Sequence, residues 1–460
     1  MDNNLYINKK KKISEKKLLE RYFDKLWPLN RSLTGNDVRK THKILSEIIP
    51  LKTYEIKSGT KVNDWIVPKE WNVKSATLKD SLGNNILDFK ENNLHLMGYS
   101  IPFKKKLKKK DLLKNLHYLK DMPKAIPYKT SYYKKKWGLC LNFEQFRKLK
   151  DKYYFVDIDT EFKNGSMTMS EYYLPGKVKK EILIHTYTCH PSLAINELSG
   201  PLVTAFLAKE IKKISNRYFS YRFVFVPETI GAVAFLSMKG NYLKKNLVAG
   251  YICNCVGHNS QITYKKTKKG STLADVAAEY VLKKVIKFKK KIINFSPSGS
   301  DERQYCSLGY NLPVGSLMRV PYGKYKEYHT SLDNKKIISF ESMIGTIQIY
   351  KKIFKFIEKN YIKLENKKKK PKEKIKKYHY NVVTKGEPFL TKYKILYKTK
   401  NHAIADKLTL ATKWLIHFSD GFNSLDKISK LSKINISILK NSLNTLINKK
   451  IIKKVKNKSI

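Results

Sequence analysis

The sequence predicts an α/β fold in which a mixed sheet is flanked by helices. Between about residues 154 and 359, helix-type segments such as 202–214 and 272–286 alternate with strand-type apolar runs, which lie at 181–187, 222–227, 248–256 and 313–318. This alternation is typical of a mixed or parallel sheet with helices on both faces. With 460 residues, 42% of them hydrophobic, the chain is long enough for one large core and smaller modules.

The segment before this alternation divides into three parts. Residues 14–48 have the pattern of two amphipathic helices. From about 53 to 103 the pattern becomes strand-like, with a turn at Gly59, and 104–120 is basic and helix-prone. We expect an N-terminal part of the main domain at 1–50, a small inserted β-domain at 51–112 and the main α/β domain at 113–365.

The C-terminal part is set apart by composition. Residues 366–378 are rich in Lys and Glu and predict a solvated charged linker. Residues 379–460 are expected to form a winged-helix-like domain, because three short helical patterns follow one another at 405–417, 425–431 and 436–447. DNA binding is one interpretation. We favour a protein contact or dimerisation module, because 436–447 contains no arginine or glutamine to read bases.

The formal net charge of +56 resembles that of nucleic-acid-binding proteins. However, only 8 of the 94 basic residues are arginine, whereas proteins that read polyanions usually use arginine for bidentate contacts. We therefore attribute the lysine excess to coding composition and expect nucleic acid to bind only non-specifically.

The cysteines and the N-terminus indicate a compartment. The five cysteines are scattered and fit reduced thiols. The first 17 residues are polar and Lys-rich, and no run of eighteen apolar residues occurs in the sequence. We expect a cytoplasmic protein that does not contact a membrane.

Three polar residues follow predicted strands and suggest one assembled site. His190 follows the run at 181–187, His329 follows 313–318, and Glu228 follows 222–227. Histidines at the carboxyl ends of core strands are common metal ligands, and a carboxylate there can act as a general base. Alternatively, each histidine is a satisfied structural residue, and Glu228 caps the helix that follows it.

A polar loop, Asp301, Glu302 and Arg303, is a candidate for substrate recognition by charge. The alternative is an internal salt-bridge network. An aromatic-rich stretch at 126–133 is suited either to lining a pocket or to packing against one.

The motifs resemble a family of bacterial aminopeptidase-like proteins described as domains of unknown function and related to zinc exopeptidases of the M28 type. Seven segments carry the resemblance, at 28–35, 59–71, 88–95, 189–192, 227–231, 299–305 and 327–331. The resemblance implies a zinc-exopeptidase-like core, an inserted β-domain and a C-terminal winged helix.

The resemblance also implies one zinc ion held by His190, Asn196 and His329, with Glu228 as the catalytic base. The family pattern has an aspartate at the position of Asn196, and a neutral amide oxygen is a weaker zinc ligand than a carboxylate. We therefore expect zinc to bind weakly or not at all, and Glu197 to point elsewhere. Tyr187 and His258 stand where the pattern has a histidine and an aspartate, and they are further candidates for contacts with substrate.

Two functions follow from these observations. The first is a zinc-dependent aminopeptidase-like hydrolase acting on a peptide or a related amide. The second is a catalytically inactive peptidase-like protein that binds a ligand and contacts a protein or nucleic-acid partner, or a second copy of itself, through the winged helix. A DNA-binding regulator is a third reading that rests only on the winged helix and the charge.

Overall fold

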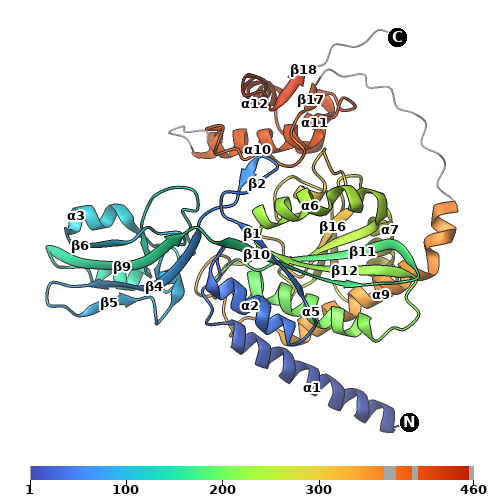
Figure 1. The fold of residues 1–460 in the computed structure, drawn as a ribbon, viewed down its shortest axis with the longest axis horizontal. Helices are drawn as coiled ribbons and strands as arrows, with labels where there is room; N and C mark the ends of the chain where they lie inside the picture. Colours follow the sequence, from blue (N-terminus) through green and yellow to red (C-terminus); the bar gives the residue numbers. More distant parts are fainter. Residues whose placement is uncertain (1, 367–379, 396–401, 455–460) are drawn as a thin grey trace.

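An eight-stranded mixed sheet forms the centre of the main domain, in the order β1-β10-β12-β11-β13-β16-β14-β15 (Figure 1). The structure, a computed structural model, describes residues 2–366, 380–395 and 402–454. The four central strands are parallel to one another, and antiparallel pairs flank them on both sides. The strands are β1 (Lys52–Lys57), β10 (Ser166–Leu174), β11 (Val178–Tyr187), β12 (Phe219–Val226), β13 (Leu247–Cys253), β14 (Ile262–Lys265), β15 (Lys290–Ile293) and β16 (Val314–Met318).

Helices cover both faces of this sheet, which explains why its central strands are continuous apolar runs. Every residue of β12 and of β16 is buried, as expected for parallel strands covered on both sides. Helices α1, α2, α5, α7 and α9 pack on one face and α6 on the other (Figure 1). Their bounds are α1 (Asp2–Leu26), α2 (Asn36–Ser46), α5 (Ser199–Lys212), α6 (Ile230–Asn246), α7 (Leu273–Tyr280) and α9 (Phe340–Asn366), with the short α8 (Glu302–Tyr305). Two π-helical turns, η3 (Ala194–Leu198) and η4 (Val281–Val285), adjoin α5 and α7.

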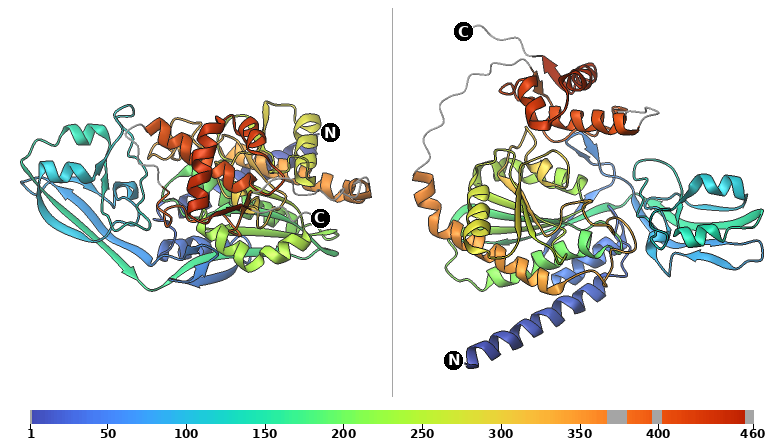
Figure 2. Two further views of the ribbon diagram at one scale, coloured as in Figure 1. Left: turned by 90° about the horizontal axis from the view of Figure 1, so that it is seen from above. Right: turned by 180° about the vertical axis from the view of Figure 1, so that it is seen from behind.

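A smaller β-module projects from one end of the main domain (Figures 1 and 2). It contains an antiparallel four-stranded sheet in the order β5-β4-β9-β6. Its strands are β4 (Glu70–Lys79), β5 (Asn85–Asp88), β6 (Phe103–Lys108) and β9 (Tyr153–Lys163). Short elements complete it: β7 (Leu116–His117), β8 (Leu139–Cys140), α3 (Lys109–Leu112), α4 (Phe143–Arg147), η1 (Asn93–His95) and η2 (Leu113–Asn115). The short strands β2 (Lys61–Val62) and β3 (Trp65–Ile66) pair with each other and lie outside the module, where β2 is close to α10 (His402–Phe418) (Figure 1).

The module differs from the expected inserted domain at 51–112 at both ends. β1, which the sequence placed in the module, pairs with β10 in the main sheet. β9, which the sequence placed in the main domain, pairs with β4 and β6. The helix-prone stretch at 104–120 is only partly helical. Residues 103–108 form β6, because backbone pairing with β9 outweighs the helix propensity of its exposed lysines, and the short helical segments α3 and η2 follow at 109–115.

The C-terminal unit, residues 380–395 and 402–454, has its own apolar core. It comprises α10 (His402–Phe418), α11 (Leu425–Ser432), α12 (Ile436–Asn448) and an antiparallel pair of β17 (Tyr380–Val382) and β18 (Ile452–Lys454). The three helices lie where the sequence predicts them, and the side chain of Asn435 caps α12. The expected charged linker at 366–378 lies outside the described residues except for its first position.

No helix within the described parts of the chain combines the length and the apolar character that crossing a membrane requires.

Candidate metal centre

Two adjacent strand ends bring a histidine and a carboxylate together. β11 and β12 are parallel and pair Tyr187 with Val226, so the residues that follow them leave the sheet at the same edge. His190 follows β11, Glu228 follows β12, and Nε2 of His190 lies 3.7 Å from Oε2 of Glu228. This edge of a parallel sheet is where α/β proteins place their sites.

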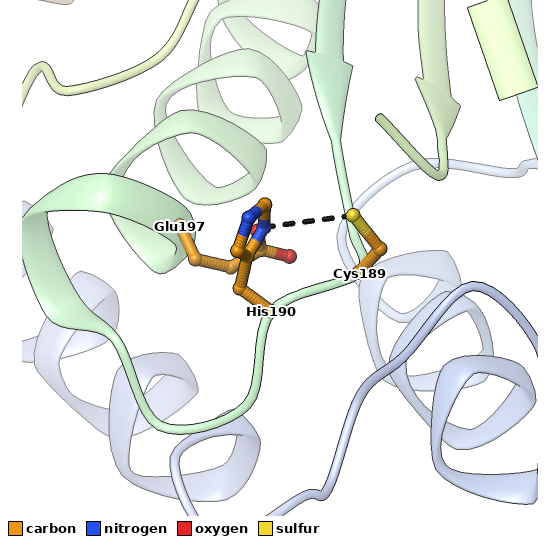
Figure 3. Close-up of side chains that lie close together, drawn as sticks. All are labelled: Cys189, His190 and Glu197. Carbon is orange, nitrogen blue, oxygen red and sulfur yellow. Dashed lines mark hydrogen bonds and ion pairs between the residues drawn. The ribbon is translucent and has the colours of Figure 1, made fainter. Parts of the chain in front are cut away.

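A buried carboxylate binds the other ring nitrogen of His190. Nδ1 lies 2.7 Å from Oε2 of Glu197, and Figure 3 shows the two side chains close together. Nε of Arg31 donates to the carbonyl oxygen of His190 at 3.0 Å and lies 3.7 Å from Oε1 of Glu197. A carboxylate on the outer nitrogen commonly orients a metal-ligating histidine. Our expectation that Glu197 points elsewhere is therefore wrong, because its carboxylate is directed at His190.

Among the buried polar atoms around His190 that have no hydrogen-bond partner, two belong to the other expected ligands. One is Nε2 of His329, whose ring centroid lies 5.6 Å from that of His190. The other is Oδ1 of Asn196. The ring centroids of Tyr187 and His190 are 5.0 Å apart. Tyr187 fixes the orientation of the Asn196 amide. Its hydroxyl donates to the carbonyl oxygen of Asn196 at 2.8 Å, so it accepts from Nδ2 of the same residue at 2.9 Å, which leaves Oδ1 unpaired. Buried acceptors without partners are costly, and a bound ion is one way to satisfy them.

The two histidines differ in their protonation. Burial, aided by the nearby His190, lowers the pKa of His329 to about 3, so this ring is neutral at physiological pH. Burial also disfavours a charged His190, but Cys189 and Glu197 beside it raise the His190 pKa well above its usual value. A ligating imidazole must be neutral, so metal binding at His190 requires the release of a proton.

Cys189, His190 and Glu197 offer a second possible ligand set. Among the described residues, one ligand atom from each of them lies within 4.8 Å of the others (Figure 3). Each atom is already occupied, however. Sγ of Cys189 accepts the N–H of Glu228 at 3.1 Å, and burial raises the pKa of this thiol to about 11. The Glu197 carboxylate binds Nδ1 of His190 and lies next to Arg31. We therefore assign Cys189 and Glu197 to the support of His190 and Glu228.

Glu228 begins a strained turn. Thr229 has φ 63° and ψ −74°, and the N–H of Ile230 donates to the carbonyl oxygen of Glu228 at 2.8 Å. These values describe a γ-turn with positive φ, which is rare and strained. Strain of this kind persists only where surrounding contacts impose it, and it is frequent at functional sites.

The Glu228 carboxylate is suited to proton transfer. Its side chain keeps 28% of its surface exposed, and Oε1 accepts a hydrogen bond from Oγ of Ser300 at 2.9 Å. Partial burial raises the pKa of Glu228 to about 7; His190 opposes this shift and Asp301 adds to it. A carboxyl group with a pKa near neutrality can both accept and donate a proton at physiological pH.

Asp301 supports the turn from a buried network in which sequence reasoning did not find His185. Its Oδ1 accepts the N–H of Thr229 at 2.8 Å, and its Oδ2 lies 2.8 Å from Nε2 of His185. Nδ1 of His185 in turn lies 2.9 Å from the hydroxyl of Tyr305. His185 is inside β11, where a polar residue in an apolar strand was the only signal.

Glu302 and Arg303 are also engaged within the protein. Oε1 of Glu302 forms a buried ion pair with Lys265 at 2.7 Å, and Nε of Arg303 lies 3.0 Å from Oε2 of Glu387 in the C-terminal unit. These contacts favour an internal network over recognition of a charged substrate by Asp301, Glu302 and Arg303.

The two remaining candidates, Tyr187 and His258, have different surroundings. Tyr187 lies at the site, through its contacts with Asn196. His258 lies beside Tyr325, with ring centroids 5.8 Å apart. The aromatic stretch at 126–133 reaches the site instead: the ring of Tyr128 lies 5.2 Å from those of His190 and His329.

Asp333 anchors the turn that carries Asn196 and Glu197. Its carboxylate oxygens accept the N–H groups of Ile195 at 2.7 Å and Asn196 at 3.0 Å, and the hydroxyl of Tyr325 at 2.7 Å. Sequence reasoning missed it, although it closely follows His329 in a polar turn.

Comparisons with known proteins show the family of this chain. A model of the family described as domain of unknown function (DUF4910) matches residues 20–360. The chain belongs to this family. A relative from Clostridium acetobutylicum is 40% identical over 435 residues, which cover 94% of this chain and 95% of that protein. Its name assigns it provisionally to polysaccharide biosynthesis and gives it an aminopeptidase-like domain.

Solved structures extend the similarity to zinc enzymes. The crystal structure of a provisionally assigned peptidase from Clostridium acetobutylicum has a TM-score of 0.74, 37% identity and 99% coverage of both chains. A zinc aminopeptidase from Bacillus subtilis has a TM-score of 0.51 at 12% identity, covering 74% of this chain and 94% of that one. A peptidase M28 precursor from Shewanella amazonensis has a TM-score of 0.50 at 11% identity, covering 75% and 97%. The mixed α/β fold of this DUF4910 member is therefore that of the M28-type aminopeptidases.

Proposed function

We propose that this DUF4910 member is a zinc-dependent hydrolase of the aminopeptidase type, acting on a peptide or a related amide with one zinc ion. The observation that carries the proposal is a pair of neighbouring histidine rings, with centroids 5.6 Å apart, together with buried polar atoms that lack partners. Nε2 of His329 and Oδ1 of Asn196 are buried and unpaired, and Nε2 of His190 faces the Glu228 carboxylate. The similarity to zinc aminopeptidases supports the same reading.

His190, His329 and Asn196 are the residues that would hold the metal. Two imidazole nitrogens and an oxygen form a common zinc ligand set, with a position left for water or substrate. The neutral Asn196 oxygen makes this site weaker than one with a carboxylate. Bound zinc would polarise the amide carbonyl and lower the pKa of a water molecule.

Glu228 would act as the catalytic base. With its pKa near 7, it would take the proton from water and pass it to the departing amine. Ser300 would hold one carboxylate oxygen and leave the other, which faces His190, for this transfer. Tyr128, which is only partly buried, would contact the substrate, whereas the buried Tyr187 would hold Asn196 in place.

The test combines zinc analysis with hydrolysis. Purified protein should contain zinc near one equivalent, or take it up on addition, and should cleave amide substrates such as peptides with free amino termini. A chelator should remove this activity, and Glu228→Gln should lower kcat by about a hundredfold or more while zinc content is unchanged. Full activity in Glu228→Gln would sink the proposal.

An inactive binding protein is the second candidate, and Asn196 is the observation that favours it. In that case the protein hydrolyses nothing, and Glu228→Gln changes no measurable property. The C-terminal unit would then contact a protein or a second copy of the chain. Chelator-sensitive hydrolysis by the unaltered protein would count against this candidate.

A further inference from the structure

The C-terminal unit places a buried carboxylate directly behind the turn that carries Glu228. Glu387 is only 5% exposed. Its Oε2 lies 3.0 Å from Nε of Arg303 and accepts a hydrogen bond from Nε2 of Gln304 at 2.9 Å. Glu387 therefore binds two consecutive residues of the main domain through one oxygen.

Arg303 carries this contact to the strained turn. Its guanidinium bridges two elements: Nε contacts Glu387 and Nη2 donates to Oγ1 of Thr229 at 3.2 Å. The Thr229 N–H is bound separately by Asp301. Both groups that fix Thr229 thus come from 301–303, and one of them depends on Glu387.

Further contacts near Glu387 hold the C-terminal unit against the rest of the protein. The indole Nε1 of Trp65 donates to the carbonyl oxygen of Glu387 at 2.8 Å, and the ring of Trp65 stacks on Phe389 at 4.5 Å. Nε2 of His417, in α10, lies 3.1 Å from the carbonyl oxygen of Arg303. These contacts keep the carboxylate of Glu387 next to the guanidinium of Arg303.

We propose that Glu387 is a positioning residue for the site: acting through Arg303 and Thr229, it holds the γ-turn that presents Glu228. The C-terminal unit then helps to position the site in the main domain. The effect on catalysis rests on the proposed role of Glu228, whereas the effect on the turn does not.

The first experiment compares Glu387→Gln with Lys392→Gln. Glu387→Gln keeps the shape and removes the charge that holds Arg303. Lys392 provides the matched control, because it joins the same unit to Asp64, in the turn between β2 and β3, at 2.8 Å. Hydrogen–deuterium exchange of peptides covering 227–231 should accelerate in Glu387→Gln and stay unchanged in Lys392→Gln. Equal exchange in both variants would overturn the proposal.

Kinetic measurements distinguish a change at the site from a general loss of stability. Glu387→Gln should lower kcat by about tenfold, the size typical of lost outer partners of an active site, with KM and melting temperature nearly unchanged. Lys392→Gln should retain the original kcat, and an equal loss of kcat in both variants would contradict the proposal.

A double-mutant cycle tests whether Glu387 acts on Thr229 through Arg303. Thr229→Val removes the hydroxyl that Arg303 binds but keeps the branched shape. If Arg303 links Glu387 to Thr229, the double variant should lose little more than either single variant. Additive losses would refute the linkage. If the unaltered protein hydrolyses nothing, the proposed function fails, and the same cycle measured by hydrogen exchange still decides whether Glu387 holds the turn.

Discussion

At the scale of single residues, the proposed zinc site makes a specific prediction for Asn196. Tyr187 fixes the amide so that Oδ1 is the free atom. A neutral oxygen in that place lacks the charge that a divalent cation favours, although its position is suited to a ligand.

Asn196→Asp should therefore tighten zinc binding by at least roughly tenfold, because a charged partner contributes about 1–2 kcal/mol more than a neutral one. Competition with a chromophoric chelator measures the affinity directly. Asn196→Ala, which removes the oxygen, is the control and should bind more weakly than the unaltered protein. An aspartate variant that binds no more tightly would show that position 196 is not a ligand.

The sequence is informative for residues at strand ends and silent on the residues that orient them. His190, Glu228 and His329 each follow an apolar run, so their common edge could be predicted. Glu197 and Arg31 could not, because the contact between Arg31 and His190 joins residues that are 159 positions apart in the chain. No local pattern encodes such a contact, and the buried ion pair becomes visible only when the helices are packed.

At the scale of elements, α2 packs against the sheet through a buried histidine. Nδ1 of His42 lies 2.6 Å from Oγ of Ser170 in β10, and Nε2 lies 3.1 Å from Oγ1 of Thr188. Burial lowers the pKa of His42 from 6.5 to about 3, so the folded protein keeps this ring neutral.

This burial should make stability fall in mild acid. Below pH 6.5 the unfolded chain binds a proton that the folded protein binds only near pH 3, so unfolding becomes easier as pH falls between these values. At pH 5 the part of the loss relative to pH 7 that is due to His42 should be about 2 kcal/mol. Urea unfolding at both pH values, for the unaltered protein and for a variant without His42, measures it.

His42→Gln is the matched variant for this prediction, because it keeps a hydrogen-bonding side chain that does not titrate. Between pH 7 and pH 5, its free energy of unfolding should fall by about 2 kcal/mol less than that of the unaltered protein. An identical pH dependence in both proteins would assign the acid sensitivity to other groups.

Element boundaries were predicted well inside the main domain and poorly at the β-module. β11, β12, β13 and β16 coincide with apolar runs, since burial on both faces produces an unmistakable pattern. β9 alternates buried and exposed residues, as β4 does, and such alternation does not reveal which sheet a strand joins. Only the pairing partners, which are remote in sequence, decide that.

At the scale of the whole molecule, the charge of +56 should produce polyanion binding without sequence preference. Affinity for a DNA duplex should fall by roughly a thousandfold between 50 and 200 mM salt, as counterion release predicts. Fluorescence anisotropy with two unrelated duplexes measures both properties, and the two curves should coincide. A marked preference for one duplex at physiological salt would instead support a DNA-binding regulator.

The route by which the chain folds is constrained by where the β-module lies. β1 and β10 are paired neighbours, yet the whole module separates them in the chain. An unstructured connection of that length would impose a loop-closure penalty on their pairing. The module removes this penalty by closing on itself: Glu70 pairs with Lys163, and the N–H of Ser58 donates to the carbonyl oxygen of Gly165 at 2.9 Å. A formed module would hold the starts of β1 and β10 side by side, so the stability of the module should affect how readily the edge of the main sheet pairs.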